Sequence, residues 1–367
     1  MGKRELLIAF AFLVVGIVAW QFTAPPASGD RGFSLRDLWN RAREEMRADS
    51  ERARITRTET IALDRAVREV RLTELPRGLK IVGEAREDLA YELSVESTGP
   101  TAAAATASAE RVALLTDTLG ETLSLRIEYP GAGQQRALLL LRVPHRVAIR
   151  AQGIRGVEAS DLASLHFDGV SGDVTARAIR GAVTGTHSAG ELVVSGAASV
   201  KLTLLPGSRA RIDQVTDGVT IDARTGQLTI DGTAGPLEIT GLNEQIRIAR
   251  HTGEVRIGGS GGRVELDGPT ADTRVDMRRA EIEVTLRAAV PLALLTTDEP
   301  ITLTIAGTPA IVLDAAATDA RIDATALALQ PDVSGSDARL AHVFVPGAAA
   351  RVSLRNLRGD IVIAKVK

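Results

Sequence analysis

Residues 217–230 read Asp-Gly-Val-Thr-Ile-Asp-Ala-Arg-Thr-Gly-Gln-Leu-Thr-Ile, and this stretch decides the fold. It holds two nine-residue units, in each of which a turn former precedes an apolar, a polar and an apolar residue: Val219-Thr220-Ile221 and Leu228-Thr229-Ile230. Alternation with a period of two predicts a short strand that buries two side chains and exposes the one between them. A helix would instead place its apolar residues three and four positions apart.

The same unit recurs along the chain. Turn formers or polar residues follow one another at intervals of nine from Gly172 to Gly262, and the register slips once, around Val200 to Leu204. One such strand cannot bury its apolar face alone, so units of equal length stack as rungs. The sequence therefore predicts an all-β fold, a parallel β-solenoid (β-helix) whose core is a ladder of Val, Ile and Leu.

Exposed charges offer a test of the number of strands per turn, because opposite charges favour neighbouring positions on a sheet. A spacing of two units brings together opposite charges in two pairs: Glu238 with Arg256, and Arg247 with Glu265. The same spacing brings together like charges in two other pairs: Arg256 with Arg274, and Glu265 with Glu283. Two and three strands per turn therefore both stay open.

The predicted solenoid spans residues 151–367, and a separate β part precedes it at 58–150. An alanine-rich insertion near 98–118 interrupts this earlier part, and it is either a loop or a short helix that runs to Leu119. After Leu286 the repeat loosens, although apolar pairs continue. Six further strands are expected outside the regular repeat: Glu69–Leu72, Leu79–Val82, Leu89–Val95, Leu123–Ile127, Leu138–Val143 and Asp360–Ala364.

Residues 1–29 are predicted to form a signal anchor or transmembrane segment. Two basic residues precede an apolar run from Leu6 to Trp20, whose length lies between that of an export signal and that of a spanning helix. Prolines stand beside Ala24 and Ala27, so there is no clean small-x-small cleavage site. Retention as an anchor is therefore favoured over cleavage.

Residues 30–57 are predicted to form an amphipathic juxtamembrane helix with Ser34 as its candidate N-cap. Such a helix packs on the body as a spacer, mediates self-association or lies on the membrane surface. Basic residues flank the apolar run on both sides, so the positive-inside rule does not decide the orientation. The expected location is the inner (cytoplasmic) membrane, single pass, with the body outside the cytoplasm. Five apolar residues recur at helical spacing: Leu35, Leu38, Trp39, Ala42 and Met46.

Composition excludes several kinds of partner and site. The formal net charge is -2 and aromatic residues make up 3% of the chain, so neither a basic field for nucleic acid nor an aromatic platform for stacked sugars or bases is expected. No nucleic-acid partner is predicted. The chain has no cysteine, which rules out disulfides, thiolate metal sites and a lipid-modified cysteine anchor.

Two glycine-containing motifs resemble catalytic or phosphate-binding loops only in part. Thr186-His187-Ser188-Ala189-Gly190 lacks the first glycine and the following helix of a nucleophile elbow, so a polar turn is expected. Gly258–Gly262 leads into a strand instead of a Lys-Ser pair and a helix, so a wide solenoid turn is expected. Neither motif predicts chemistry.

Candidate metal ligands are equally scattered. The five histidines never fall at a metal-ligand spacing, although His166 and His187 are candidates to approach each other in the fold. Asp213, Asp222 and Asp231 repeat at nine but lack the glycine pattern of a calcium-binding nonapeptide, so they are expected to form turns. The sequence predicts no catalytic residue, no cofactor and no metal site.

The chain from about Thr58 to Lys367 resembles a bacterial putative-adhesin family of unknown function. The resemblance implies a right-handed β-solenoid of a kind often tethered in bacterial envelopes, and it implies no catalytic residues. It rests on loose patterns of glycine and alternating aliphatic residues: Val70, Leu72, Gly78, Leu79, Ile81, Gly83, Asp88, Leu89, Tyr91, then Val143-Pro144 before Val147 and Ile149.

These observations predict a non-enzymatic, membrane-anchored envelope protein that presents a β-solenoid as an adhesion or scaffold surface. Its expected partners are the membrane, through the N-terminal helix, and envelope proteins or cell-wall material, with self-association as a further option. Two alternatives stay open. One is a polysaccharide-acting parallel β-helix enzyme, which needs several acids and a base in one cleft. The other is a cytoplasmic, membrane-bound solenoid that polymerises end to end.

Overall fold

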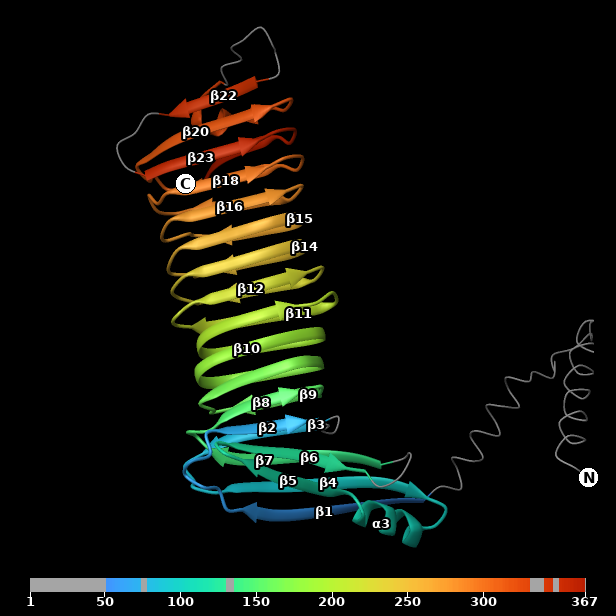
Figure 1. Ribbon diagram of the computed structural model, residues 1–367. Coiled ribbons are helices and arrows are strands. Elements are labelled where there is room, and N and C mark those ends of the chain that lie inside the picture. The colour runs from blue at the N-terminus through green and yellow to red at the C-terminus, as the bar shows by residue number, and fades with distance from the viewer. Residues whose placement is uncertain (1–50, 74–77, 130–134, 331–339, 346–349, 367) are drawn as a thin grey trace, which may run out of the picture. The chain divides into compact units, whose positions relative to one another are not determined.

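The computed structural model describes residues 51–73, 78–129, 135–330, 340–345 and 350–366 (Figure 1). Residues 52–367 form one compact unit. No helix among the described residues is long and apolar enough to cross a membrane. The predicted anchor at 1–29, together with residues 30–50 of the predicted amphipathic helix, lies outside the described residues.

The described residues are almost all strand, as the sequence predicts. The part before residue 161 contains β1 (Glu51–Ile61), β2 (Glu69–Thr73), β3 (Gly78–Glu84), β4 (Leu89–Gly99), α3 (Ala102–Glu110), β5 (Ala113–Leu119), β6 (Thr122–Glu128), β7 (Gln135–Pro144), β8 (Ala148–Gln152) and β9 (Arg155–Ser160). All five strands that the sequence predicts before residue 150 are present, as β2, β3, β4, β6 and β7.

The rest of the chain continues the strand pattern. Its elements are β10 (Ser164–Leu204), β11 (Ser208–Val215), β12 (Val219–Arg224), β13 (Gln227–Asp231), β14 (Leu237–Ala249), β15 (Val255–Asp267), β16 (Thr273–Arg278), β17 (Glu281–Leu286), β18 (Leu292–Thr296), β19 (Ile301–Ala306), β20 (Ile311–Thr318), β21 (Ile322–Asp323), the 3₁₀-helix η1 (Thr325–Leu327), β22 (Leu340–Val345), β23 (Ala350–Asn356) and β24 (Ile361–Val366).

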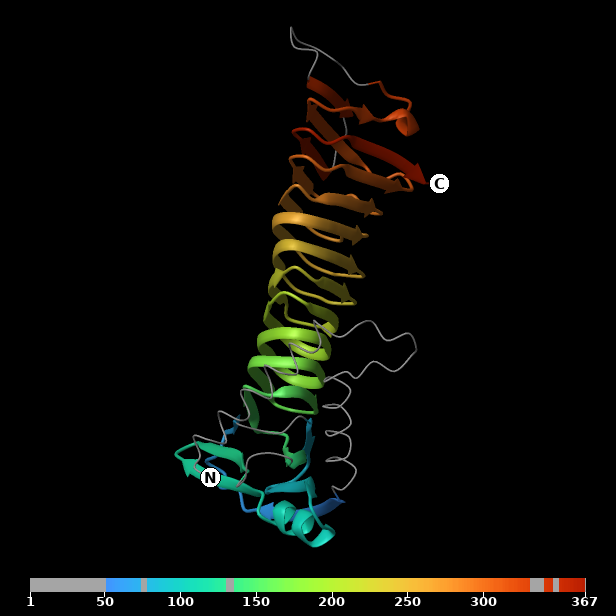
Figure 2. The ribbon, with the colours of Figure 1, turned by 90° about the vertical axis from the view of Figure 1, so that its right-hand side faces the viewer.

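Parallel pairing sets the length of one solenoid turn at two of the nine-residue units. Ile212 in β11 pairs with Ile230 in β13, which pairs with Ile248 in β14. The intervening units pair among themselves, as Ile221 does with Ile239. Each turn therefore contains two strands, which settles the number that the charges left open. Figure 2 shows the turns stacked one above another.

Two parallel sheets result. The first sheet contains β2, β8, β12, β16, β18 and β23, and the second contains β3, β9, β11, β13, β17, β19 and β24. The long elements β10, β14 and β15 contribute to both sheets, because their backbone keeps strand geometry around a corner. The outward surfaces of these sheets are called the first face and the second face below.

Inward side chains form continuous apolar ladders. Val219, Leu237 and Val255 stack in register in the first sheet, and each is only 1% exposed. Full burial of one such side chain stabilises the fold by about 1.5–3 kcal/mol. The core of Val, Ile and Leu that the repeat predicts is thereby confirmed.

The predicted register slip is also present. Gly190 pairs with Ser208, which lies two full units further along the chain, whereas Val200 pairs with Val219, one position beyond that spacing. One turn therefore accommodates one extra residue. Because pairing beyond this point returns to the regular two-unit spacing, the apolar side chains keep pointing inward.

The predicted boundary between residues 150 and 151 is wrong, since it falls inside β8. The solenoid begins earlier, because β2 pairs in parallel with β8 and β3 pairs in parallel with β9. These two strands form a first turn, and the chain then leaves the stack before β8 starts the next one. The excursion obscured this first turn in the sequence, because it separates partners such as Leu72 and Ala151 by far more than two units.

The excursion builds a cap at the N-terminal end of the stack (Figure 1). β6 and β7 extend the first and second sheets by parallel pairing with β2 and β3. β5 then pairs antiparallel with β6, and β4 pairs antiparallel with β7. β1 pairs with β4. Antiparallel strands thus cover the end of the parallel stack.

The alanine-rich insertion is half helix and half strand. Thr101 caps α3, because its Oγ1 accepts a hydrogen bond from the Ala104 N–H at 3.2 Å. The helix ends at Glu110, and β5 occupies the region up to Leu119 where the sequence left a longer helix open. Pairing with β6 explains the difference, since it satisfies the backbone of β5.

Residues 51–57, which the sequence assigns to the amphipathic helix, belong to strand β1 instead. From Ala53 to Arg57 exposure alternates between half-buried and exposed residues, which is the period of a strand. β-branched residues at Ile55, Thr56 and Thr58 favour that conformation. The helix prediction therefore extended too far.

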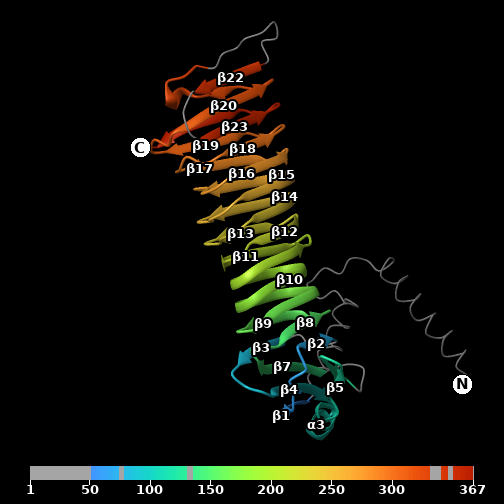
Figure 3. The same cartoon turned by 60° about the vertical axis from the view of Figure 1, so that its left-hand side comes forward.

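The chain closes the C-terminal end of the stack out of order (Figure 3). β23 lies between β18 and β20, because it pairs in parallel with both. β24 likewise lies between β19 and β21. The chain therefore leaves a gap of one turn between β18–β19 and β20–β21, and β23 and β24 later fill this gap. β22 pairs antiparallel with β20 at this end.

Candidate functional site

A hollow of about 600 Å³ lies on the second face, where the cap meets the solenoid. It is lined from four neighbouring strands, β7, β3, β9 and β10. Gly78 pairs with Leu138, whose side chain lies so close to Gly78 that a Cβ there would collide with it. Gly156 lines the hollow from the next strand. Two strands thus contribute glycines, which place no side chain of their own into the hollow.

The walls of this hollow combine apolar and charged groups. Leu138 is 54% exposed, so it offers an apolar surface. Lys80 Nζ lies 2.9 Å from Glu158 Oε1, and this pair is neutral as a whole. Arg177 also lines the hollow and, among the described residues, has no carboxylate within ion-pair distance. The hollow can therefore hold an apolar group against Leu138 and an anionic group against Arg177.

A second hollow, of about 460 Å³, crosses β14, β15, β17 and β19 on the same face. Beside it, Arg263 binds three glutamates: its Nη2 lies 2.7 Å from Glu283 Oε2 and its Nη1 lies 3.4 Å from Glu281 Oε2. Its Nε lies 3.0 Å from Glu265 Oε1, in a geometry that makes an ion pair without a hydrogen bond. The hydrogen bond to Glu283 is the main cause that raises the pKa of Arg263.

Two more arginines line this second hollow. Arg247 Nη1 lies 3.8 Å from Glu265 Oε2, and Arg287 Nη2 lies 2.7 Å from Asp267 Oδ1. Acids and bases therefore converge on one groove, which is the arrangement that the enzyme alternative requires. Each of these acids is also held in an ion pair, so the carboxylates that line the groove are already neutralised within the chain.

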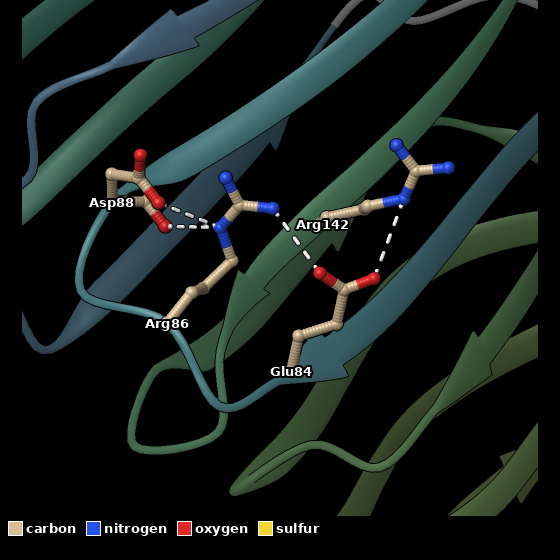
Figure 4. Close-up of polar contacts among 4 residues, drawn as sticks. All are labelled: Glu84, Arg86, Asp88 and Arg142. Carbon is tan, nitrogen blue, oxygen red and sulfur yellow. Dashed lines mark hydrogen bonds and ion pairs between the residues drawn. The ribbon is translucent and has the colours of Figure 1, made fainter.

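At the end of β3, four charged side chains pair with one another (Figure 4). Arg86 Nε donates to Asp88 Oδ1 at 2.7 Å, and its Nη1 donates to Glu84 Oε2 at 3.1 Å. Arg142 Nε lies 3.3 Å from Glu84 Oε1. The hydrogen bond from Arg86 holds the pKa of Asp88 below its usual range. The cluster ties the turn between β3 and β4 to β7.

The segment that partly resembles a nucleophile elbow is a buried corner of β10. His187 is fully buried, with Nδ1 3.0 Å from Ser208 Oγ and Nε2 2.8 Å from the Gly172 carbonyl oxygen. Ser188 Oγ donates to the Val170 carbonyl at 3.1 Å. Both polar side chains therefore stabilise neighbouring turns, and neither is presented to a substrate.

His166 and His187 have different surroundings and partners. His166 Nδ1 lies 2.8 Å from Thr184 Oγ1 on the first face. Burial, and then the nearby charge of Arg150, lower the pKa of His166. The two histidines therefore do not contribute to a common metal site. In the described part of the chain, no three His, Asp or Glu side chains lie close enough together to hold a metal ion.

The nine-residue aspartate repeat divides between the two sheets. Asp213 pairs with Asp231 in the second sheet, whereas Asp222 lies in the first. Arg211 Nε donates to Asp213 Oδ2 at 2.8 Å, and Arg250 is bonded to Asp231. These aspartates are strand residues held by arginines, not the turn residues that the sequence predicts.

The glycine-rich run Gly258–Gly262 forms a corner within β15, which confirms the expected wide turn. Gly259, Gly261 and Gly262 all have positive φ angles, at 144°, 72° and 88°. Side chains are disfavoured in this region, so glycine lets the backbone turn there. The glycine run therefore has a structural role at this corner of the solenoid.

One glutamate lies inside the solenoid. Glu244 is 1% exposed, and its Oε2 has no hydrogen-bond partner among the described residues. Burial raises the pKa of Glu244 to about 7, although a backbone hydrogen bond at Gly226 acts in the opposite direction. His251 is also buried, which lowers its pKa, and its Nδ1 lies 2.9 Å from Thr233 Oγ1.

The larger of the two hollows has no signal in the sequence. Gly78 and Gly156 line it from strands that lie on either side of the excursion in the chain. The acids around Arg263, in contrast, follow the two-unit spacing, as Glu265 and Glu283 do. A search for charges at that spacing would have found them once two strands per turn were known.

No family model matches the chain, and no curated protein sequence matches it. A solved structure of a putative cell adhesion protein from Clostridium sporogenes is similar to it, with 10% identity over 85% of this chain and 100% of that chain and a TM-score of 0.21. A putative adhesin from Parabacteroides distasonis is 9% identical over 85% of this chain and 97% of that chain, with a TM-score of 0.38.

A putative adhesin from Parabacteroides merdae is also similar, with 10% identity over 85% of this chain and 96% of that chain and a TM-score of 0.27. All three of these solved structures are named as putative adhesins or as a putative cell adhesion protein.

Proposed function

We propose that this chain is a non-enzymatic, membrane-anchored envelope protein that presents its β-solenoid as an adhesion or scaffold surface. The observation that carries the proposal is a stack of two-stranded turns with antiparallel strands at both ends. Between these end strands, the stack offers its two long faces to a partner. A continuous apolar core makes these faces regular, as in other repeat proteins.

Anchoring is supported by the apolar run Leu6–Trp20 at the start of the chain. The proposed arrangement is a single pass through the inner membrane with the solenoid outside the cytoplasm. Envelope proteins and cell-wall material are then the partners within reach. The antiparallel strands β5 and β22 count against the polymerising alternative, because they interrupt the parallel pairing that end-to-end growth would continue.

The direct test is retention of the full chain, held in detergent, by isolated cell-wall material and by envelope membranes. Co-sedimentation with either one is expected. Arg177→Glu reverses the charge in the larger hollow and is expected to weaken retention if this hollow makes the contact. Arg209→Glu, at an exposed position of the same face outside the hollow, is the matched control. No retention of a monomeric chain by either material contradicts the proposal.

The groove beside Arg263 favours one second candidate, a polysaccharide-acting enzyme. Glycoside cleavage commonly uses two carboxylates, and Glu265, Glu281 and Glu283 converge there. Release of reducing sugar ends from wall polysaccharide, lost in Glu283→Gln, would establish this activity. Unchanged polysaccharide after incubation with the intact chain would support the non-enzymatic proposal.

A further inference from the structure

Three basic side chains stack on the first face next to the cap. Arg71 in β2 pairs in register with Arg150 in β8, which pairs with His166 in β10. Neighbouring strands lie about 4.8 Å apart, and like charges directly opposite each other destabilise a sheet. A ladder of this kind therefore needs nearby counter-charges.

Other like-charge pairs in this protein have such counter-charges. Glu265 and Glu283 share Arg263. Arg256 and Arg274 also pair in register, and each contacts an acid two residues away in the chain, at 3.3 Å and 3.4 Å respectively: Glu254 and Asp276. The chain thus neutralises these repulsions internally.

The ladder of Arg71, Arg150 and His166 is compensated only in part. Arg71 Nη2 lies 3.2 Å from Glu69 Oε1, but its Nε is buried and has no acceptor among the described residues. Arg150 is exposed and has no carboxylate within ion-pair distance in the described part of the chain. Asp168 acts on His166 from a distance. Arg150 therefore keeps its guanidinium donors available to a ligand, and Arg71 offers the exposed part of its guanidinium group, since its side chain is 43% exposed.

Hydroxyl and amide groups surround these donors. Ser124 in β6 pairs with Arg71 on one side of the ladder, and Thr184 bonds to His166 on the other. Gln152 lies at the end of β8, on the same strand as Arg150. Asp117, opposite Ser124 in β5, marks the limit of the basic region. The first face thus offers charged donors next to neutral polar groups, with two acids at its margins: Glu69 beside Arg71, and Asp168, which pairs in register with Gln152.

We propose that this ladder binds an acidic polysaccharide that carries carboxylates and lies across the strands, along the solenoid axis. The inference rests on the proposed function and names its ligand class. Carboxylates match the fork of a guanidinium group and pair with Arg71 and Arg150. Sugar hydroxyls bond to Ser124 and Gln152. These neutral neighbours favour a carboxylated sugar chain over a phosphate polymer, which has no comparable hydroxyls.

The probe is polygalacturonate, with neutral dextran and polyphosphate as comparison polymers, and the full chain in detergent is titrated at low and high salt. Arg150→Gln keeps an exposed polar side chain and is expected to weaken polygalacturonate binding about tenfold. Arg209→Gln is the matched control, since Arg209 is also exposed on a strand and lacks an ion pair among the described residues. It is expected to leave binding unchanged.

Three results would overturn the assignment: no binding of polygalacturonate at low salt, equal weakening by both substitutions, or tighter binding of polyphosphate than of polygalacturonate. Dextran is expected not to bind. Thermal unfolding confirms that each variant folds. Failure of the ladder is distinguishable from failure of the adhesion proposal, because retention on wall material and envelope membranes is measured without this polymer.

Discussion

Glu265 and Glu283 lie side by side in neighbouring strands of the second sheet, and Arg263 contacts both carboxylates, at 3.0 Å and 2.7 Å. Two strands per turn impose this meeting of like charges, because they bring positions two units apart into register. The arginine that relieves the repulsion comes from the strand of Glu265 itself. The repulsion between these two glutamates is thus offset by an arginine close by on the same face.

Arg263→Gln is expected to lower the free energy of unfolding, because it leaves Glu265, Glu281 and Glu283 close together. The effect is modest because these side chains are partly exposed and screened by water. Chemical denaturation at low salt measures it. Adding Glu283→Gln to the variant is expected to restore part of the loss, and no restoration would contradict the proposed repulsion.

Glu244→Gln is expected to stabilise the fold above neutral pH. The pKa of Glu244 is raised from 4.5 to about 7 in the folded chain. The native protein therefore loses stability as the pH rises between these values, and the loss is complete above the folded pKa. The substitution removes this dependence, so the variant's advantage is about 1–3 kcal/mol at pH 8 and smaller at pH 5.

Denaturation at both pH values checks this expectation. Glu238→Gln, at an exposed position of β14, is the matched control and is expected to show no such difference between the two pH values. An advantage of Glu244→Gln that is equal at both would contradict a raised pKa.

Gly259→Ala is expected to destabilise the solenoid by about 3–5 kcal/mol, from an unfavourable φ and a steric clash together. The φ angle of Gly259 is 144°, and an added Cβ would overlap the carbonyl oxygen of Gly241 in the preceding turn. Gly232→Ala is the control, because Gly232 has a φ of 60° and open space around it. Similar unfolding midpoints for the two variants would refute the proposed close stacking.

Removal of residues 346–367 is expected to make the chain aggregate. β23 and β24 fill the place between β18–β19 and β20–β21, so their loss leaves strand edges and the buried Leu292 and Leu313 without partners. Light scattering and size-exclusion chromatography measure the outcome. Val366→Asp keeps the place filled and changes a residue that is 54% exposed, so this variant should remain soluble.

The repeat at Val219 and Leu228 was enough to predict a parallel solenoid with an apolar ladder, because strand alternation and turn formers recur at one interval. The number of strands per turn was not predictable from charge. Arg256 and Arg274 are in register although they repel each other, since each has its own acid nearby. Because each arginine is neutralised by an acid close by in the chain, the charge pattern did not reveal the spacing of two units per turn.

The first turn and the basic ladder were hidden for a different reason. Arg71 and Arg150 are neighbours in space, but the cap is inserted between them in the chain. Likewise, β23 fills its place only after the chain has passed it. Pairing of this kind depends on the path of the chain, which periodicity alone does not reveal.

The presentation of the solenoid outside the cytoplasm is the central claim, and membrane topology tests it most directly. One reporter that is active only outside the cytoplasm and one that is active only inside are fused, separately, to Lys367. The account predicts activity of the outside reporter and silence of the inside one. Activity of the inside reporter alone would contradict it, because the two faces would then be closed to wall and surface partners.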